Sequence, residues 1–162
     1  NRRNQRLLGF STISYMAKKI ITTNRKAGFN YELLGKYEAG ISLLGSEVKS
    51  IRAGHIDIKE GYVTIAKGEA FLYNANISAY EHLSDRKYEP IRPRKLLLHK
   101  KEIAKLQEKI SIKGLAVVPT EVYLKNGLVK VELAVAKGKK HWDKREAIKK
   151  REIERELRKI KS

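Results

Sequence analysis

The chain has 162 residues, with 36 Lys and Arg against 18 Asp and Glu, and a formal net charge of +18. Its 41% hydrophobic content suffices for one domain core, and no apolar run approaches the length of a membrane span. It contains no cysteine, which excludes disulfides and thiolate metal sites. Because such a charge excess repels itself, the composition predicts a polyanionic partner, first nucleic acid and second a membrane surface.

Residues 1–15 carry three Arg and no acidic residue, and we expect a disordered leader there. Met16 resembles the natural first residue of the protein. The leader is then a vector-derived remnant, an upstream extension or the remnant of an Arg-rich transit peptide, and these alternatives stay open. No long apolar block is present, which argues against a secretory signal.

A basic stretch, Asn24, Arg25 and Lys26, precedes the first long strand pattern. It is either a solvated turn or a strand that contacts phosphate groups. The segment from Tyr31 to Leu44 alternates apolar with polar or small residues, which predicts one or two half-buried strands.

A short helix is predicted for Ser46–Ala53. Ser46 can cap it, and Glu47 lies in the first turn, where the helix dipole favours an acidic residue. Lys49 and Arg52 lie three residues apart, so two cations project together from one turn.

Two hairpins and a second helix follow. Strands at Tyr62–Ala66 and Ala70–Ile77 form a hairpin, and Asn126-Gly127 is a strong turn signal for a second one, because both residues tolerate a positive φ. Glu81–Lys95 lacks periodicity and reads as a long basic surface loop. Apolar residues at helical spacing predict a helix within Leu97–Ile112.

The predicted fold is mainly β with short helices. About six strands in a domain over residues 16–136 favour a small closed antiparallel barrel, since closure removes exposed strand edges. The pattern by itself also allows a sandwich.

The C-terminal tail, residues 137–162, has a different composition. Twelve Lys or Arg and five acidic residues give it a net charge of +7. Ile153, Leu157 and Ile160 form a narrow apolar stripe, which buries too little surface to hold a helix in water. We therefore expect a tail that is disordered when free and helical when bound to a polyanion.

Trp142 is the only Trp in the chain and lies among cations. It either packs back on the barrel, or it or His141 stacks on an exposed RNA base while neighbouring cations bind phosphate.

No catalytic set is evident. The four His residues are scattered without zinc-ligand spacing, and Gly40 to Gly45 resembles only the start of a P-loop. The acids Glu38, Glu47 and Asp57 would be needed for a metal-dependent nuclease, the least favoured alternative. We expect a protein that is not an enzyme and needs no cofactor or metal.

Four ordered segments carry a family resemblance: Asn24–Ala27, Glu38–Gly54, Arg92–Leu98 and Ala136–Arg145. Together they resemble the small protein B (SmpB) family, whose members bind transfer-messenger RNA (tmRNA) in bacterial ribosome rescue. The resemblance implies an oligonucleotide-binding (OB)-type barrel whose face holds the tRNA-like domain of tmRNA. The implied RNA-binding residues are Asn24, Arg25, Lys26, Glu38, Lys49, Arg52, Arg94, Lys95, Leu98 and His99.

The resemblance further implies an adaptor that enters stalled ribosomes with elongation factor Tu and places its tail in the decoding centre and the empty mRNA channel. Glu38 is expected to orient a basic side chain or to accept from a base. We expect a monomer in the cytoplasm, or in an organelle matrix if the leader is a transit-peptide remnant. A structural ribosomal protein bound to ribosomal RNA is the alternative. The segment implied at the decoding centre is Gly138, Lys139, Lys140, His141, Trp142, Asp143, Lys144 and Arg145.

Overall fold

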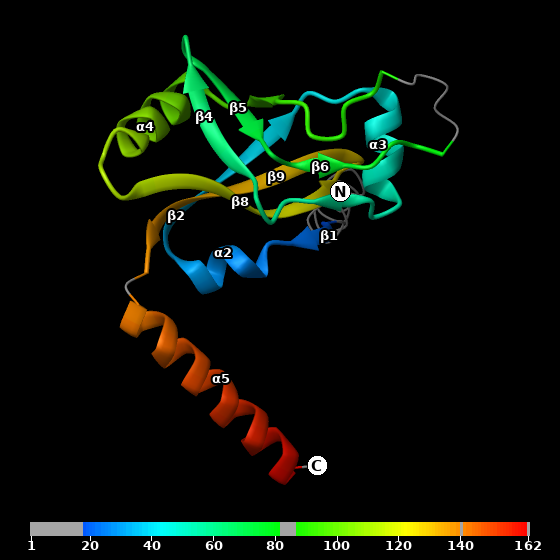
Figure 1. Ribbon diagram of the computed structural model, residues 1–162. Coiled ribbons are helices and arrows are strands. Elements are labelled where there is room, and N and C mark those ends of the chain that lie inside the picture. Colours follow the sequence, from blue (N-terminus) through cyan, green and yellow to red (C-terminus); the bar gives the residue numbers. More distant parts are fainter. Residues whose placement is uncertain (1–17, 82–86, 140, 162) are drawn as a thin grey trace, which may run out of the picture.

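The computed structural model describes residues 18–81, 87–139 and 141–161 (Figure 1). The expected leader, residues 1–15, lies outside the described residues. The elements in chain order are β1 (Lys19–Thr23), α2 (Arg25–Asn30), β2 (Tyr31–Ile41), α3 (Gly45–Arg52), β3 (Ile56–Asp57), β4 (Tyr62–Ala66), β5 (Glu69–Tyr73), β6 (Asn76–Ile77), β7 (Arg94–Leu97), α4 (Lys100–Ile110), β8 (Leu115–Lys125), β9 (Leu128–Gly138) and α5 (His141–Lys161).

Seven antiparallel strands form one curved sheet in the order β1-β8-β9-β2-β7-β5-β4, and β3 pairs with β6 separately. The prediction of a mainly β fold with two hairpins is confirmed. β8 and β9 turn through Asn126 and Gly127, at φ 53° and 76°, and β4 and β5 turn through Lys67 and Gly68, at 52° and 74°. Gly and Asn fit the left-handed conformation that such tight turns need.

The sheet is not closed, so the predicted closed barrel is wrong. Among the described residues, the edge strands β1 and β4 each pair on one side only. The start of β4 approaches β8, but the two strands do not pair. They contact each other by packing of the Pro119 ring against Gly61. A Cβ on Gly61 would be 2.8 Å from Pro119 Cγ. Proline also lacks the N–H that a ladder uses, and a bulge interrupts β8 between Pro119 and Glu121. We call this junction the seam.

The main core lies on one face of the sheet. The helices α3 and α4 each contribute a fully buried residue, and they lie at opposite ends of the sheet (Figure 1). A smaller cluster lies on the other side, where α2 packs on β8 and β9 through Ala27, Val118 and Ala136. The largest apolar members of the main core are Ile51, Ile58, Leu72, Ile77, Leu96, Leu106 and Leu133.

Three local predictions are wrong. The basic stretch after Thr23 is neither turn nor strand, because Asn24 caps the helix α2. The predicted surface loop ends early, since Arg94–Leu97 forms β7 between β2 and β5. Ser46 does not cap α3: the helix begins at Gly45, and the Leu44 N–H donates to Glu47 Oε1 at 2.9 Å.

The tail contains one long helix, α5, which leads away from the sheet (Figure 1). The Arg151 guanidinium lies 5.2 Å from the centre of the Phe29 ring on α2. Ile153, Leu157 and Ile160 are exposed along α5. The helix has the form predicted for the bound tail, while disorder of the free tail stays a prediction. Within residues 18–81, 87–139 and 141–161, no helix is both long and apolar enough to cross a membrane.

Candidate RNA interface

A groove of about 560 Å³ collects four of the predicted RNA-binding residues: Glu38, Lys95, Leu98 and His99. Glu38 comes from β2, Lys95 from β7, and the other two from the connection into α4. Gly40 pairs with Leu97 in the sheet, which brings the two distant segments together. A Cβ on Gly40 would be 3.2 Å from the Cβ of Leu97, tighter than ordinary contact, so a small residue suits this crossing.

His99 sits at the start of α4 and is exposed. Its backbone N–H donates to Glu102 Oε1 at 3.1 Å, which satisfies a donor at the helix start. His99 lies where the chain passes from β7 to α4, and it lines the groove.

Glu38 belongs to a network on the outer face of the sheet. It accepts a hydrogen bond from the Tyr123 hydroxyl and forms an ion pair with Lys125 Nζ at 3.3 Å. The hydrogen bond from Tyr123 lowers the pKa of Glu38 below its ordinary value. Burial raises this pKa by a smaller amount, and Lys125 lowers it further. Burial and then the Glu38 carboxylate raise the pKa of Tyr123. Glu38 is therefore an anion that pairs with Lys125, and its role toward RNA stays a prediction.

Lys49 and Arg52 project from α3 beside the β8–β9 hairpin. Both are exposed, as predicted from their spacing. Arg52 Nη2 lies 3.4 Å from the Gly127 carbonyl oxygen, and Lys49 Nζ lies 5.3 Å from the centre of the Tyr80 ring. An apolar hollow of about 310 Å³ separates α3 from the groove and shares Gly40, Leu97 and Lys130 with it.

The groove and the hollow thus form one continuous surface with cations at its borders. Lys130 lies between them and was missed from the sequence, as were Tyr123 and Lys125. The register pairs Gly40 with Lys130, so a correct pairing of β2 with β9 would have found it. We name this surface the RNA face, after the RNA contact that the sequence predicts for its residues, and define it by Glu38, Lys49, Arg52, Lys95, Leu98 and His99.

Arg94 does not belong to the RNA face, which corrects its prediction as an RNA contact. Its side chain is 0% exposed. The guanidinium donates to Glu47 Oε2 from Nη2 at 2.5 Å and from Nε at 2.8 Å, and to the Ala75 carbonyl at 2.8 Å. Arg94 therefore ties β7 to α3, and it contributes to the RNA face by holding α3 in place.

Asn24 is also structural. Its Oδ1 accepts from the Ala27 N–H at 3.1 Å, and its Nδ2 donates to the carbonyls of Pro119 at 2.9 Å and Ile58 at 3.2 Å. The side chain is buried and fully occupied, so the prediction that it contacts RNA is wrong.

Arg25 and Lys26 are exposed on α2, apart from the RNA face. Lys26 forms an ion pair with Glu60, which raises the pKa of Lys26 through that hydrogen bond. Lys26 lines a pocket that shares no residue with the groove.

The predicted decoding-centre segment is described in part. Lys139 is tied to α2, because its N–H donates to the Asn30 carbonyl and its Nζ to the Gly28 carbonyl, both at 3.1 Å. Gly138 ends β9, and Arg145 is exposed on α5. Lys140, and the side chains of His141, Trp142, Asp143 and Lys144, lie outside the described part.

The described residues hold no group of three His, Asp or Glu side chains that could ligate a metal. They bring the predicted nuclease acids into no common site: Glu47 is buried, Glu38 binds Tyr123, and Asp57 accepts from the Lys59 N–H at 2.9 Å.

Comparison with known proteins identifies the family. The sequence model described as "SmpB protein" matches residues 21–162. The chain belongs to the SmpB family. Family members named SsrA-binding protein include one from Persephonella marina, 54% identical over 144 residues, covering 89% of this chain and 95% of the relative. Another, from Dehalococcoides mccartyi strain 195, is 51% identical over 150 residues, covering 93% and 87%.

A solved structure supports the same fold within the family. It is described as "tmRNA-SmpB: a journey to the center of the bacterial ribosome", with a TM-score of 0.64 and 44% sequence identity. The match covers 78% of this chain and 93% of that chain.

Proposed function

We propose that this chain is an RNA-binding adaptor of trans-translation, which binds tmRNA and accompanies it to stalled ribosomes. The relatives carry the name SsrA-binding protein, and the similar solved chain is described with tmRNA and the bacterial ribosome. The observation that carries the proposal is the RNA face, where separate segments that resemble the family's motifs meet on one surface.

The RNA face would hold the tRNA-like domain of tmRNA. Lys49, Arg52 and Lys95 would bind phosphates, while Leu98 and His99 would contact sugar or base surfaces. Folded RNA is recognised mainly by shape, backbone and unstacked bases, and a groove bordered by cations suits such recognition. The exposed cations of α2, Arg25 and Lys26, would extend the contact to a second side of the domain.

The tail would act in the ribosome. In this proposal the segment from Gly138 to Arg145 lies at the decoding centre, and α5 occupies the empty mRNA channel. The protein would act as a monomer without enzymatic activity, in the cytoplasm, delivered together with elongation factor Tu. The basic surface of α5 supports a contact with ribosomal RNA.

A competition titration tests the adaptor role. The full chain is titrated with the tRNA-like domain of tmRNA against an ordinary tRNA, at several salt concentrations. We expect a clear preference for the tRNA-like domain and a shallow salt dependence. Equal affinity with a steep salt dependence would mean that the net charge of +18 binds RNA without recognition.

Two further measurements separate the tail from the sheet domain and the adaptor from a ribosomal protein. Trp142→Ala should leave binding to the tRNA-like domain unchanged and impair tagging of stalled chains, whereas equal loss of both would contradict the division of roles. On salt-washed ribosomes an adaptor should be substoichiometric. Full occupancy would favour the structural ribosomal protein instead.

A further inference from the structure

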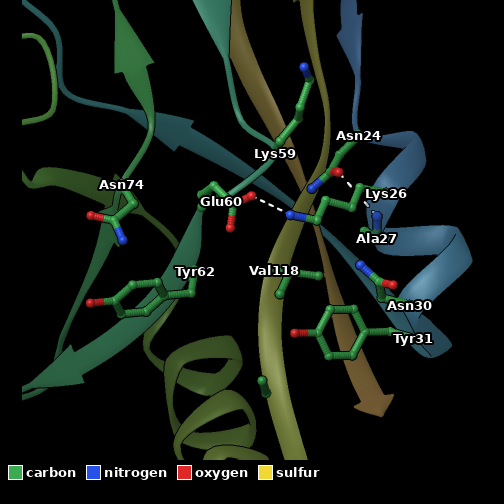
Figure 2. Close-up of a pocket in the computed structure, with 12 residues that line it drawn as sticks. Asn24, Lys26, Ala27, Asn30, Tyr31, Lys59, Glu60, Tyr62, Asn74 and Val118 are labelled. Atoms are coloured by element: carbon green, nitrogen blue, oxygen red, sulfur yellow. Dashed lines mark hydrogen bonds and ion pairs between the residues drawn. The ribbon is translucent and has the colours of Figure 1, made fainter. Parts of the chain in front are cut away.

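A pocket of about 460 Å³ lies at the seam, between α2 and the start of β4 (Figure 2). It exists because β4 approaches β8 without pairing, and Gly61 and Pro119 hold the two strands at packing distance. None of its lining residues belongs to the RNA face. We name it the seam pocket.

Two tyrosines give the seam pocket aromatic walls. Figure 2 shows Tyr31 and Tyr62 on opposite sides of Val118. The Tyr62 ring is stacked on Tyr73, with centroids 5.5 Å apart and planes 11° apart, and Tyr62 is 42% exposed. One face of Tyr62 is thus covered and braced, while the ring stays accessible. Exposed, braced aromatic rings next to cations are typical of surfaces on which unstacked nucleobases lie.

Two asparagine amides supply polar groups at the rim. Asn30 comes from the end of α2 and Asn74 from the end of β5. Within the described part of the chain, neither side-chain amide has a hydrogen-bond partner. An amide offers both a donor and an acceptor, the combination that pairs with the edge of a nucleobase.

Cations surround the same pocket. Lys59 and Lys26 line it, and their side chains are 68% and 49% exposed. Lys26 is bound to Glu60, and this ion pair joins α2 to the turn that precedes β4 (Figure 2). An ion pair between exposed side chains is weak, so a phosphate could take Lys26 from Glu60. The released carboxylate would then accept a hydrogen bond from an amino group of a base.

We propose that the seam pocket binds one unstacked nucleotide of single-stranded RNA. The base lies between Tyr31 and Tyr62, the asparagine amides contact its edge, and Lys26 and Lys59 bind the adjoining phosphate. The site is separate from the RNA face and shares only Lys26 with the contact proposed for the tRNA-like domain, so its tyrosines and asparagines test it independently of that recognition.

The test uses the full chain labelled with nitrogen-15 and a single-stranded adenosine hexanucleotide. We expect the nuclear magnetic resonance signals of the Gly61, Tyr62 and Asn74 amides to shift on titration, together with the side-chain amide of Asn30. Tyr62→Leu removes the ring and should weaken hexanucleotide binding about tenfold, while Tyr62→Phe, which keeps it, should bind as the original chain does.

Glu60→Gln adds a test with the opposite sign. It keeps an acceptor, removes a negative charge and releases Lys26, so hexanucleotide affinity should rise a few-fold. Lys105→Ala, which removes an exposed cation from α4, is the matched charge control and should change affinity less than Lys59→Ala.

Equal hexanucleotide affinity of Tyr62→Leu and the original chain would overturn the proposal. Signal shifts confined to Leu98, His99 and their neighbours would also overturn it, because the hexanucleotide would then bind only the RNA face. Neither result would alter a preference for the tRNA-like domain in the competition titration, so the two proposals fail separately.

Discussion

The Glu47 carboxylate and the Arg94 guanidinium form an ion pair in which both side chains are 0% exposed. Glu47 Oε2 accepts from Arg94 Nη2 and Nε, while Oε1 accepts from the Leu44 N–H and from Arg92. The Tyr88 hydroxyl also lies 3.2 Å from Oε2. One carboxylate thus accepts from a backbone N–H at the start of α3 and joins that helix to β7. It thereby positions the cations of α3 on the RNA face.

Arg94→Met should destabilise the fold by about 3–5 kcal/mol, because the buried Glu47 carboxylate then lacks the positive charge and the hydrogen bonds of Arg94. Urea unfolding followed by circular dichroism measures this change. Arg92→Met is the matched control. Its side chain is 30% exposed, so we expect the free energy of unfolding to fall by about 1 kcal/mol. If Arg94→Met weakened RNA binding without lowering stability, the structural assignment of Arg94 would be wrong.

Acid should weaken the Glu47 contribution to stability. Burial opposes ionisation of Glu47, but hydrogen bonds from Arg92, Leu44 and Arg94 outweigh it and hold the pKa below its ordinary value of 4.5. The unfolded chain therefore binds the proton more readily, and this contribution is present above pH 4.5 and lost as the pH falls through the lower folded pKa.

Comparison of the original chain with Glu47→Gln checks this pH dependence. The difference in free energy of unfolding should be constant near neutral pH and should shrink as the pH falls below about 4.5, the ordinary carboxyl value. Parallel curves over the whole acidic range would show that Glu47 has an unshifted pKa.

Lys95→Ala should weaken binding to the tRNA-like domain and reduce the slope of log affinity against log salt by about 1, as loss of one phosphate contact predicts. Within the part of the chain that the structure describes, Lys95 pairs with one exposed acid, Glu69, at 3.2 Å, so the fold should be little affected. Lys105→Ala on α4 is the control for a general loss of charge. Equal changes in both variants would argue against a specific groove.

Asn24→Ala should lower stability and leave the intrinsic RNA affinity of the folded protein unchanged. The variant loses the cap of α2 and removes the amide donor to the carbonyls of Pro119 and Ile58, of which Ile58 still accepts from the Gly61 N–H. Loss of a cap costs about 1 kcal/mol, and a buried group that loses its partner adds about 1–3 kcal/mol. Thermal unfolding measures the loss. A stable variant with weak RNA binding would restore Asn24 to the RNA contacts.

A peptide of residues 137–162 should be largely unordered in buffer and gain helix when RNA is added. The apolar stripe of α5 is exposed, so little burial stabilises the helix by itself. Circular dichroism with and without an RNA oligonucleotide checks this, with a scrambled peptide of the same composition as the control. Strong helicity in buffer would contradict the expectation.

Local patterns in the sequence correctly predicted several elements. The alternation of apolar and polar residues and the Asn126-Gly127 turn predicted the last hairpin, because both signals depend only on residues that are close together in the sequence. The three-residue spacing of Lys49 and Arg52 correctly placed two exposed cations on one helix. The four-residue strand β7 was missed, since so short a segment has almost no periodicity of its own.

By itself the sequence determined a basic, mainly β chain with a distinct charged tail, and through its motifs it predicted the family. Only the tertiary structure decided that the sheet is open, with Pro119 packed on Gly61 at the seam, and that Arg94 and Asn24 are buried whereas Lys95 is exposed. The reason is physical. Neighbouring basic residues look alike in sequence, but whether a cation meets a buried carboxylate or solvent depends on strands and helices paired across long sequence distances.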